Sequence, residues 1–414
     1  MTSTAKAGSS PRSFRLHISI FGRRNVGKSS IVNVLAGHRV SIVSDTPGTT
    51  TDPVKKAMEL LPLGPVIFTD TAGLDDEGEL GAQRVERTRG VMEGTDLAVI
   101  VTDTDLWGGW EEQLADDFRG SGIPVIVVRS KTDGSPMSDA FRVEMEKRKL
   151  SWVAVSAVTG DGVDDLREAL IRMAPDDFVN RPAIVSDLLP PGGTAVLVIP
   201  IDKEAPKGRI ILPQVQTIRD LLDHGCMAVV TQDGELAKAL GNLREKPAIV
   251  VTDSQAFRRV SAGTPEDILL TSFSILFARF QGDLSSMVAG AAAIDRLRPG
   301  DRVLVAEACT HHPIGEDIGT VKIPDWLGRY VGGDLEFVFQ RGSDFPADLS
   351  SFRLVIHCGA CMFNRRTMLT RIQRAEAAGV PITNYGLTIA YSLGIFERAL
   401  GPFPDALAAY RSLQ

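Results

Sequence analysis

The feature that most constrains this chain is a glycine-rich segment near its N-terminus, Gly22-Arg-Arg-Asn-Val-Gly-Lys28-Ser29, which fits the pattern G-x-x-x-x-G-K-S/T. It follows an alternating apolar segment that predicts a strand over residues 14–20, and it precedes an expected helix over Ser30–Ala36. Such a loop points backbone amides at phosphate oxygens, and the helix N-terminus adds partial positive charge. We therefore expect a nucleotide site in which Lys28 reaches the β- and γ-phosphates and the Ser29 hydroxyl binds Mg²⁺.

Two later segments predict the rest of the magnesium and γ-phosphate site. Asp70-Thr-Ala-Gly73 follows an expected strand, so its aspartate is suited to hold Mg²⁺ and its glycine amide to contact the γ-phosphate. Pro47-Gly-Thr-Thr50-Thr-Asp52 lies where a switch loop belongs, and we expect Thr50 to close on Mg²⁺ when GTP is bound. Leu74 stands where Ras-like proteins place the glutamine that orients the attacking water.

The base is expected to be guanine. Ser130-Lys131-Thr-Asp133 follows the expected strand Ile123–Val128. The Asp133 carboxylate is suited to accept hydrogen bonds from both guanine N1–H and N2–H₂, a donor pair that adenine lacks. Ser156-Ala157 follows the strand expected over Trp152–Val155 and is suited to contact the base.

These segments together predict GTP and GDP as ligands. The expected catalytic residues are Lys28, Thr50, Asp70 and Gly73, and Mg²⁺ is expected on Ser29, Thr50 and Asp70. The expected GTP-binding residues are Gly22, Asn25, Val26, Gly27, Lys28, Ser29, Ser30, Ser130, Lys131, Asp133, Ser156 and Ala157.

Beyond the nucleotide site, apolar strands, among them Ile249–Thr252 and Leu354–His357, continue to alternate with amphipathic helices, a pattern typical of α/β folds with parallel sheets. Asn364 is suited to cap one of these helices. Proline and glycine clusters near 175–193 and 261–265 suggest boundaries. We expect a flexible tail over 1–13, a P-loop GTPase domain over 14–175, a linker and small α/β domain over 176–263, and a C-terminal α/β domain over 264–414.

The composition excludes several classes of protein. The 414 residues are 43% hydrophobic and carry a net charge of −7, which argues against a general nucleic-acid binder. The N-terminal segment lacks the apolar stretch of a signal peptide, and no apolar run is long enough to span a membrane. We expect a soluble, cytoplasmic protein that binds neither nucleic acid nor membranes.

Three of the four cysteines gather near the C-terminus beside histidines, in Cys309-Thr-His311 and His357-Cys358-Gly-Ala-Cys361. Each group follows an expected strand, and strand ends of a parallel sheet meet at one edge. The second group precedes an expected helix, whose N-terminus lowers thiol pKa values. Three thiolates suit an iron–sulfur cluster or zinc, but the long gap disfavours a zinc finger. Cys226 is expected to be a core residue.

A [4Fe–4S] cluster on Cys309, Cys358 and Cys361 leaves one iron for a further ligand, which the residues themselves leave open: a histidine, a carboxylate or an exogenous group. His311 and His357 are candidates either for ligands or for partners of the ligands. The alternative reading makes these cysteines small buried hydrophobic residues without metal.

The nucleotide site resembles the potassium-activated branch of the translation-factor-related GTPases. In that branch a P-loop asparagine binds K⁺ and a hydrophobic residue replaces the glutamine. Asn25 and Leu74 match these two features, so the resemblance implies a K⁺ ion on Asn25. Ser130 departs from the branch, where asparagine is usual and ties the guanine loop to the P-loop.

The whole chain resembles the [FeFe]-hydrogenase maturation GTPases of the HydF family. The family signature C-x-H, a long gap and H-C-x-x-C reads here as Cys309, His311, His357, Cys358 and Cys361. The stretches over 312–324 and 207–216 also look like this family. The resemblance implies a homodimeric carrier with GTPase, dimerisation and cluster-binding domains. Such a carrier binds a [4Fe–4S] cluster, accepts a diiron precursor made by radical-SAM maturation enzymes and delivers it to apo-[FeFe]-hydrogenase, with GTP hydrolysis regulating partner encounters.

Three other readings compete with this one. A GTPase of tRNA modification or ribosome assembly with a zinc module would carry RNA and zinc. A redox-sensing GTPase would change its activity with the oxidation of its cluster. An interaction protein without metal would keep its function after loss of all three cysteines.

Overall fold

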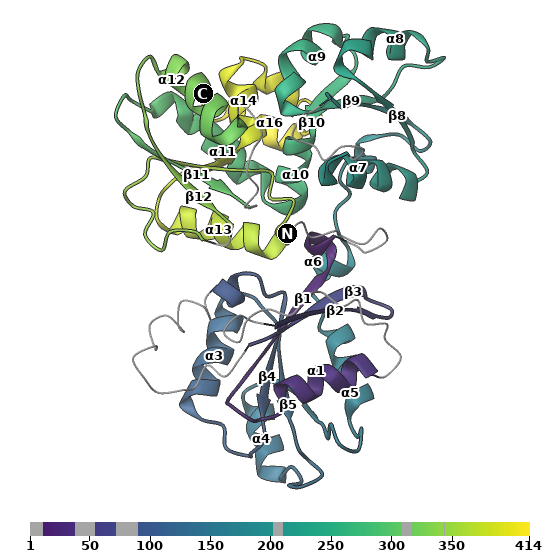
Figure 1. The fold of residues 1–414 in the computed structure, drawn as a ribbon, viewed down its shortest axis with the longest axis vertical. Coiled ribbons are helices and arrows are strands. Elements are labelled where there is room, and N and C mark those ends of the chain that lie inside the picture. Colours follow the sequence, from purple (N-terminus) through teal and green to yellow (C-terminus); the bar gives the residue numbers. More distant parts are fainter. Residues whose placement is uncertain (1–10, 38–53, 72–89, 202–209, 309–316, 343) are drawn as a thin grey trace. The chain divides into compact units, whose positions relative to one another are not determined.

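The computed structural model describes residues 11–37, 54–71, 90–201, 210–308, 317–342 and 344–414. Its chain divides into two compact units, Met1–Arg181 and Pro182–Gln414 (Figure 1). The switch-loop residue Thr50, the residues Gly73 and Leu74, and the Cys309-Thr-His311 group lie outside the described residues.

The first unit is built on a six-stranded sheet of order β2-β3-β1-β4-β5-β6. The β1, β3, β4, β5 and β6 strands are parallel, and β2 pairs antiparallel with β3. The strands are β1 (Leu16–Gly22), β2 (Val54–Leu60), β3 (Gly64–Asp70), β4 (Leu97–Thr102), β5 (Val125–Arg129) and β6 (Ser151–Ala154).

Helices cover both faces of this sheet (Figure 1). Ile31 and Leu35 of α1 and Leu166 of α5 pack with one face, whereas Phe118 of α3 and Phe141 of α4 pack with the other. The helices are α1 (Lys28–Gly37), α3 (Gly109–Gly120), α4 (Asp139–Lys147), α5 (Val163–Arg172) and the short α6 (Asp176–Val179). The strands β4 and β5 are buried at every position and apolar up to their last residues, Thr102 and Arg129. This fits the arrangement because a strand covered on both faces has no solvent side.

The second unit holds two four-stranded parallel sheets, of order β10-β9-β7-β8 and β12-β11-β13-β14. The strands of the first are β7 (Thr194–Val198), β8 (Met227–Thr231), β9 (Ile249–Thr252) and β10 (Leu269–Ser272). Those of the second are β11 (Arg302–Glu307), β12 (Glu336–Arg341), β13 (Leu354–His357) and β14 (Ile382–Asn384). The strands β8 and β12 are edges, and both are only partly covered.

The helices of this unit follow the strands they connect. They are α7 (Leu212–Asp223), α8 (Leu236–Gly241), α9 (Phe257–Gly263), α10 (Phe273–Gln281), α11 (Leu284–Ala292), α12 (Ile323–Val331), α13 (Arg365–Ala377), α14 (Tyr385–Ser392), α15 (Phe396–Leu400) and α16 (Pro404–Arg411). A short π-helical turn, Ile318–Lys322, leads into α12.

Helix α10 joins the two sheets of this unit into one body. It is buried at seven of its nine positions, and it packs against α7 of the first sheet and against α13 and α14 of the second. Its C-terminus is held by Arg365, whose Nη1 donates to the carbonyl oxygens of Arg279, Phe280 and Gly282 at 3.2, 2.8 and 2.8 Å. The last carbonyl groups of a helix have no hydrogen-bond donors within the helix, and here the Arg365 guanidinium donates to them.

Several expected elements are found where the sequence predicts them. The strands at Ile249–Thr252 and Leu354–His357 have the expected bounds, and Asn364 caps α13 by accepting a hydrogen bond from the Thr367 amide at 3.3 Å. Strand β2 was not expected, because its charged residues Lys55 and Lys56 interrupt the apolar alternation. Within the described residues, no helix is both long and apolar enough to cross a membrane.

Candidate functional site

The expected nucleotide-binding segments meet at one edge of the first sheet. Ile20 of β1 is paired with Asp70 of β3, and Thr102 of β4 is paired with Arg129 of β5. These parallel strands therefore all end at the same edge of the sheet, and the loops that follow them carry the residues of the site. Ligands bind at this edge in open α/β sheets because the loops converge there.

The phosphate loop begins with a glycine that no other residue could replace without movement. Gly22 has a φ of +152°, and a Cβ added to it would lie 2.5 Å from the Val101 carbonyl oxygen. The buried Lys28 donates from Nζ to the carbonyl oxygens of Gly22 at 2.5 Å and Arg23 at 2.7 Å. The ammonium thus lies inside its own loop, at the position from which it can reach phosphate oxygens.

The two described magnesium candidates are in direct contact. The Ser29 hydroxyl at the start of α1 donates to Asp70 Oδ2 at 2.5 Å. Hydroxyl and carboxylate oxygens are the ligands that Mg²⁺ prefers, and the ion usually keeps several waters beside them. Ser30 is exposed in the same helical turn. The third magnesium candidate, Thr50, lies outside the described residues.

Asn25, the K⁺ candidate, is exposed and has a φ of 62°, in the left-handed region that asparagine tolerates better than most residues. The loop around it is held by Arg23, which donates to both carboxylate oxygens of Glu111 at 2.7 and 3.1 Å. Burial alone would raise the pKa of Glu111, but the hydrogen bonds from Arg23 and from backbone amides, together with the Arg23 charge, outweigh it and the pKa is lowered.

Ser130 connects the guanine loop (residues 130–135) to the phosphate loop (residues 22–29). In the potassium-activated GTPases that the site resembles, an asparagine makes this connection. Its hydroxyl contacts the Val26 carbonyl oxygen at 2.5 Å and the Thr102 carbonyl oxygen at 3.2 Å. Both Ser130 and Val26 are buried, and Gly27 lies directly over the serine side chain. The departure from asparagine therefore keeps the connection between the two loops.

Asp133 is exposed, and its carboxylate is oriented by the last segment of the site. The buried Ser156 hydroxyl donates to Asp133 Oδ1 at 2.7 Å. The same hydroxyl oxygen accepts from the amides of Val158 and Thr159 at 3.3 and 3.1 Å. Ala157 is half-buried beside it. This arrangement holds one carboxylate oxygen of Asp133 in place at the edge where guanine is expected.

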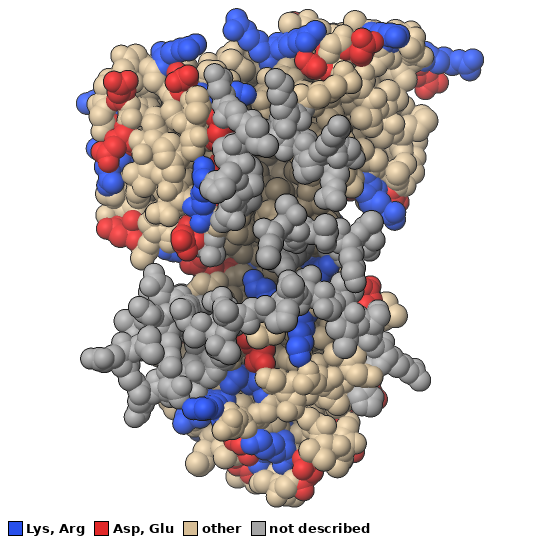
Figure 2. Space-filling model, viewed as in Figure 1, with Lys and Arg blue, Asp and Glu red and all other residues tan. Residues whose placement is uncertain are grey.

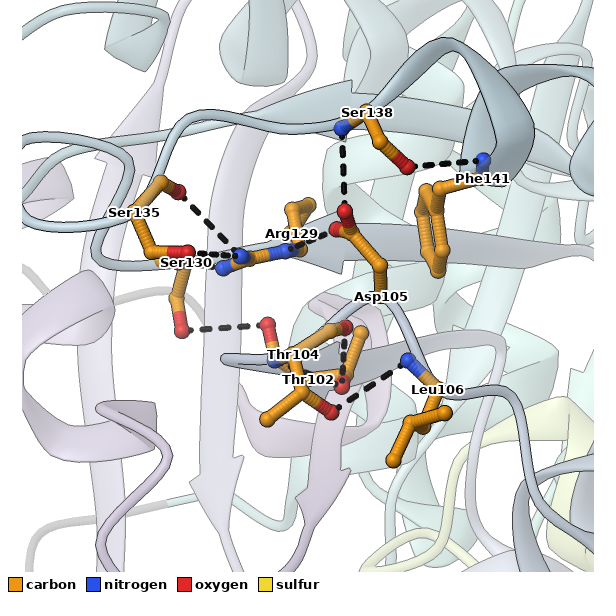
Figure 3. Close-up of polar contacts among 9 residues, drawn as sticks. All are labelled: Thr102, Thr104, Asp105, Leu106, Arg129, Ser130, Ser135, Ser138 and Phe141. Carbon is orange, nitrogen blue, oxygen red and sulfur yellow. Dashed lines mark hydrogen bonds and ion pairs between the residues drawn. The ribbon is translucent and has the colours of Figure 1, made fainter.

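The motifs in the sequence do not point to Arg129, which Figure 3 shows at the centre of a polar network beneath the guanine loop. Its side chain is 1% exposed. Nε donates to Asp105 Oδ1 at 2.8 Å and Nη1 to the Ser130 carbonyl oxygen at 2.5 Å. Nη2 donates to the carbonyl and hydroxyl oxygens of Ser135, both at 3.1 Å. A charged residue ending an apolar strand was the available signal.

Asp105 completes this network by accepting from the Ser138 amide at 3.0 Å, while the Ser138 hydroxyl caps α4. Burial alone would raise the pKa of Asp105, but the hydrogen bonds from Arg129 and Ser138 outweigh it, and the pKa is lowered. Lys131, whose φ is 55°, pairs with Asp103 at 2.8 Å.

In the second unit, Cys358 and Cys361 lie on a turn between β13 and α13, and both are free thiols. Cys358 Sγ accepts hydrogen bonds from the amides of Ala308 and Ala360 at 3.1 and 3.4 Å. The Ala308 bond brings the end of β11 next to this turn, as expected from adjacent parallel strands. Cys309 and His311, which follow Ala308 in the chain, lie outside the described residues.

The thiol pKa values differ from the expectation. Burial raises the pKa of Cys358, and burial together with the charge of Cys358 raises the pKa of Cys361 to about 12. The helix was expected to lower them, but α13 begins at Arg365, after Asn364 has capped its amides. Desolvation therefore dominates, and a bound metal ion would be needed to stabilise the thiolates.

His357 is fully buried, and both of its ring nitrogens have protein partners. Nδ1 lies 2.9 Å from the Cys358 carbonyl oxygen, and Nε2 lies 2.9 Å from Arg371 Nη1. Because Arg371 can only donate, Nε2 is the acceptor and Nδ1 carries the proton. Burial and the Arg371 charge lower the pKa of His357 to about 3, so the ring is neutral. This geometry favours a partner of the cysteine turn over a metal ligand.

Arg371 itself is 1% exposed and lies between two aromatic rings. Its guanidinium carbon is 4.7 Å from the centroid of Phe345 and 4.5 Å from that of Phe363. Its Nη2 donates to the Gly342 carbonyl oxygen at 3.2 Å. Cys226, by contrast, is buried before β8, in agreement with a core role.

The charged side chains do not gather by sign on the face drawn in Figure 2. Lys and Arg alternate with Asp and Glu over the described part of each unit there. No group of three or more His, Cys, Asp or Glu residues able to hold a metal ion occurs among the described residues.

Three family models match the chain. Residues 17–131 match a model described as a 50S ribosome-binding GTPase. Residues 184–282 match the hydrogen maturase F dimerization domain, and residues 285–402 match the hydrogen maturase F tetramerization domain. The two hydrogen maturase F models together span more than half of the chain.

Curated relatives match only the first part of the chain. The tRNA modification GTPase MnmE of Paraburkholderia xenovorans is 36% identical over 160 residues, which are 38% of this chain and 34% of the relative. The GTPase Der of Wolinella succinogenes is 35% identical over 170 residues, covering 38% of this chain and 36% of the relative. The chain thus spans about a third of the length of these relatives.

Solved structures match with low overall scores. The G domain of the T. maritima FeoB iron transporter gives a TM-score of 0.31 at 23% identity, covering 39% of this chain and 99% of that one. A point variant of Aquifex aeolicus Era bound to GDP and aluminium fluoride gives 0.33 at 19% identity, covering 60% of this chain and 99% of that one.

Proposed function

Because this chain belongs to the hydrogen maturase F family of GTPases, we propose that it is a carrier that binds a [4Fe–4S] cluster and delivers a diiron precursor to apo-[FeFe]-hydrogenase. The observation that carries the proposal is the turn of Cys358 and Cys361, two free thiols within the region that matches the tetramerization domain. The same chain has a guanine nucleotide site with candidate Mg²⁺ ligands in contact, which supports GTP hydrolysis.

The described residues of the cysteine turn fit an iron–sulfur cluster. Amide donors already point at Cys358 Sγ, and such hydrogen bonds to sulfur stabilise the thiolate form. Cys309 would supply the third thiolate from the segment after Ala308. When bound, the cluster would supply an iron with an exchangeable position, to which His311, a carboxylate or an exogenous group would bind. His357 would orient the turn through its bond to the Cys358 carbonyl oxygen.

For the GTPase reaction, Lys28, Ser29 and Asp70 would bind the phosphates and Mg²⁺, and Asn25 would bind an activating K⁺. The cation would supply positive charge near the developing phosphate charge, in the role that an arginine finger has in other GTPases. The turnover of GTP would control encounters with the hydrogenase and with the radical-SAM enzymes that make the precursor.

A homodimer is supported by the match to a dimerization domain and by exposed apolar side chains in that region. They lie on and around α7 and the edge strand β8, where a second copy of this chain would cover them. These side chains are Ile210, Ile211, Val215, Leu222, Met227 and Val230, with exposed fractions between 36% and 60%.

The cluster is tested first by measuring iron and sulfide, with EPR of the reduced protein, after anaerobic reconstitution. Wild type is compared with Cys309→Ala, Cys358→Ala and Cys361→Ala, and Cys226→Ala is the matched control because its thiol is buried elsewhere. We expect about four irons per chain in wild type and in the control, as a [4Fe–4S] cluster requires, and loss of the reduced signal in the other three. Stoichiometric zinc, or iron that does not respond to these changes, would sink the carrier function.

Delivery is tested by activation of apo-[FeFe]-hydrogenase with loaded protein. Lys28→Ala, which removes the phosphate-binding cation, should slow activation while leaving the iron content unchanged. Activation that never responds to loss of GTP binding would show that GTP does not control the encounter. Copurifying RNA together with zinc would instead favour the tRNA-modification reading, in line with the MnmE relatives that share the GTPase part.

A further inference from the structure

We propose that Arg129, with its partner Asp105, is the positioning residue that sets guanine specificity in this chain. This inference rests on the proposed GTP site. It concerns residues that lie beneath the loop and are not expected to touch the nucleotide, and it explains how a loop that begins with a serine keeps Asp133 in place.

The guanidinium of Arg129 clamps both ends of the guanine loop. Nη1 binds the carbonyl oxygen of Ser130, which starts the loop, and Nη2 binds the carbonyl and hydroxyl oxygens of Ser135, which ends it (Figure 3). Asp133 lies between these two attachment points. Because one planar group holds both ends, the distance across the loop is fixed.

The clamp is needed because the loop has a costly backbone. Lys131 adopts a φ of 55°, a left-handed conformation that residues with a Cβ take only when their surroundings impose it. The amides of Gly134 and Ser135 both donate to the Lys131 carbonyl oxygen at 3.2 Å, so this residue defines the turn that presents Asp133. Release of the Ser135 end would free that turn.

Asp105 holds the Arg129 side chain in position. It holds Arg129 Nε at 2.8 Å and the Ser138 amide at 3.0 Å, so the arginine is fixed to the start of α4 on one side and to the loop on the other. A buried guanidinium is expensive to leave without partners, and here its charge is matched by one carboxylate and several oxygens. The pair is therefore a rigid support under the loop.

The consequence is specific to the base. Asp133 reads guanine through two donors, N1–H and N2–H₂, and two hydrogen bonds to one carboxylate demand a more exact orientation than one. Inosine nucleotides lack the 2-amino group and make only the N1–H bond. A loop loosened by loss of Arg129 should lose affinity for GDP more than for IDP.

The test measures dissociation constants of the full-length protein for GDP and IDP with Mg²⁺, beside a thermal melt of each variant. Arg129→Gln should weaken GDP binding about tenfold and narrow the GDP-to-IDP preference at least about threefold. Arg148→Gln is the matched control, because Arg148 pairs with Glu112 at 2.6 Å in the same unit, away from the guanine loop. It should leave the preference unchanged.

If Arg129→Gln does not fold, the GDP-to-IDP ratio of Asp105→Asn tests the inference instead. This variant keeps the arginine and weakens the contact of Arg129 with residue 105. Equal losses of GDP and IDP affinity would overturn the inference, because a merely structural role lowers both alike. An unchanged preference in a folded variant would also overturn it. Wild type that binds no guanine nucleotide would instead refute the proposed GTP site.

Discussion

The hydroxyl of Ser130 lies 2.5 Å from the carbonyl oxygen of Val26, so one short side chain connects the guanine loop to the phosphate loop. Both residues are buried, which protects the bond from competition with water. An asparagine would span the same gap with a longer side chain. The serine suffices here because the loops approach closely, with Gly27 directly over it.

Replacement of Ser130 by alanine should release this connection. A buried hydrogen bond of this kind contributes about 1 kcal/mol, which corresponds to roughly fivefold faster GDP dissociation. Stopped-flow measurement with a fluorescent GDP checks this. Ser121→Ala is the control, since its hydroxyl bonds to the Asp117 carbonyl oxygen at the end of α3, outside both loops. An unchanged GDP off-rate in Ser130→Ala would contradict the connection.

Replacement of Asp133 by asparagine should change the preferred base from guanine to xanthine. The amide would still accept from Ser156 through its oxygen, but it would offer a donor where guanine also offers donors. GDP affinity should fall about a hundredfold while XDP affinity rises. Competition binding with both nucleotides measures this, with Asp139→Asn on α4 as the exposed control. Retained preference for GDP would mean that another residue reads the base.

Replacement of Val230 by arginine should break the proposed dimer. Val230 is 50% exposed on the edge strand β8, and a charge buried at an apolar interface without a partner is strongly unfavourable. Light scattering after size-exclusion chromatography should report a halved mass. Val143→Arg serves as control, because Val143 is 61% exposed in the GTPase unit. If the mass stays the same in Val230→Arg, the interface lies elsewhere.

Replacement of Arg371 by methionine should destabilise the second unit by about 3 kcal/mol, because His357 Nε2 and the Gly342 carbonyl oxygen would lose a charged donor and two rings would lose a cation. Thermal melting of the metal-free protein measures the loss. Arg374→Met is matched to it, since Arg374 lies on the same helix over Phe345 but is only half-buried. If Arg371→Met lowers the stability no more than Arg374→Met does, the buried contacts of Arg371 do not stabilise the second unit in the way proposed.

Acid should destabilise the GTPase unit partly through Asp105. Its folded pKa is lowered, so the stabilisation is fully present above the unfolded value near 4 and is lost as the pH falls through the folded pKa. Melting temperatures of wild type and Asp105→Asn, measured between about pH 3 and 6, should therefore converge toward the acid end. Asp139→Asn, with a side chain 94% exposed, is the control. A gap between wild type and Asp105→Asn that stays constant across this range would contradict the role of the carboxylate.

The strands could be predicted from the sequence because buried parallel strands are continuous apolar runs. Ile249–Thr252 and Leu354–His357 have the expected bounds for this reason. The glycines and caps also follow local rules, as at Asn364. The contacts of Ser29 with Asp70 and of Asp133 with Ser156 lie at strand ends that the sheet brings together.

The roles of the buried charges could not be predicted in this way. Arg371 has no distinguishing signal in the sequence, and Arg129 is marked only as a charge that ends an apolar strand. Only the folded chain shows that both guanidiniums lie inside the protein. The ring of His357 could face either a metal or the protein from the same motif, and its two partners come from the turn and from α13. The thiol pKa values likewise depend on burial, which the helix position alone does not determine.

Helix α10 makes the two halves of the second unit structurally dependent on each other. It belongs to the segment that matches the dimerization domain, yet it packs against α13 and α14, and its last carbonyls are bound by Arg365 just after the cysteine turn. If a recombination joined residues 184–282 to a different C-terminal segment, the apolar helix α10 would be exposed to solvent and its last carbonyl groups would lose their hydrogen bonds. A gene that kept one of these segments without the other would therefore encode a less stable protein, and we expect the two to be inherited as a pair.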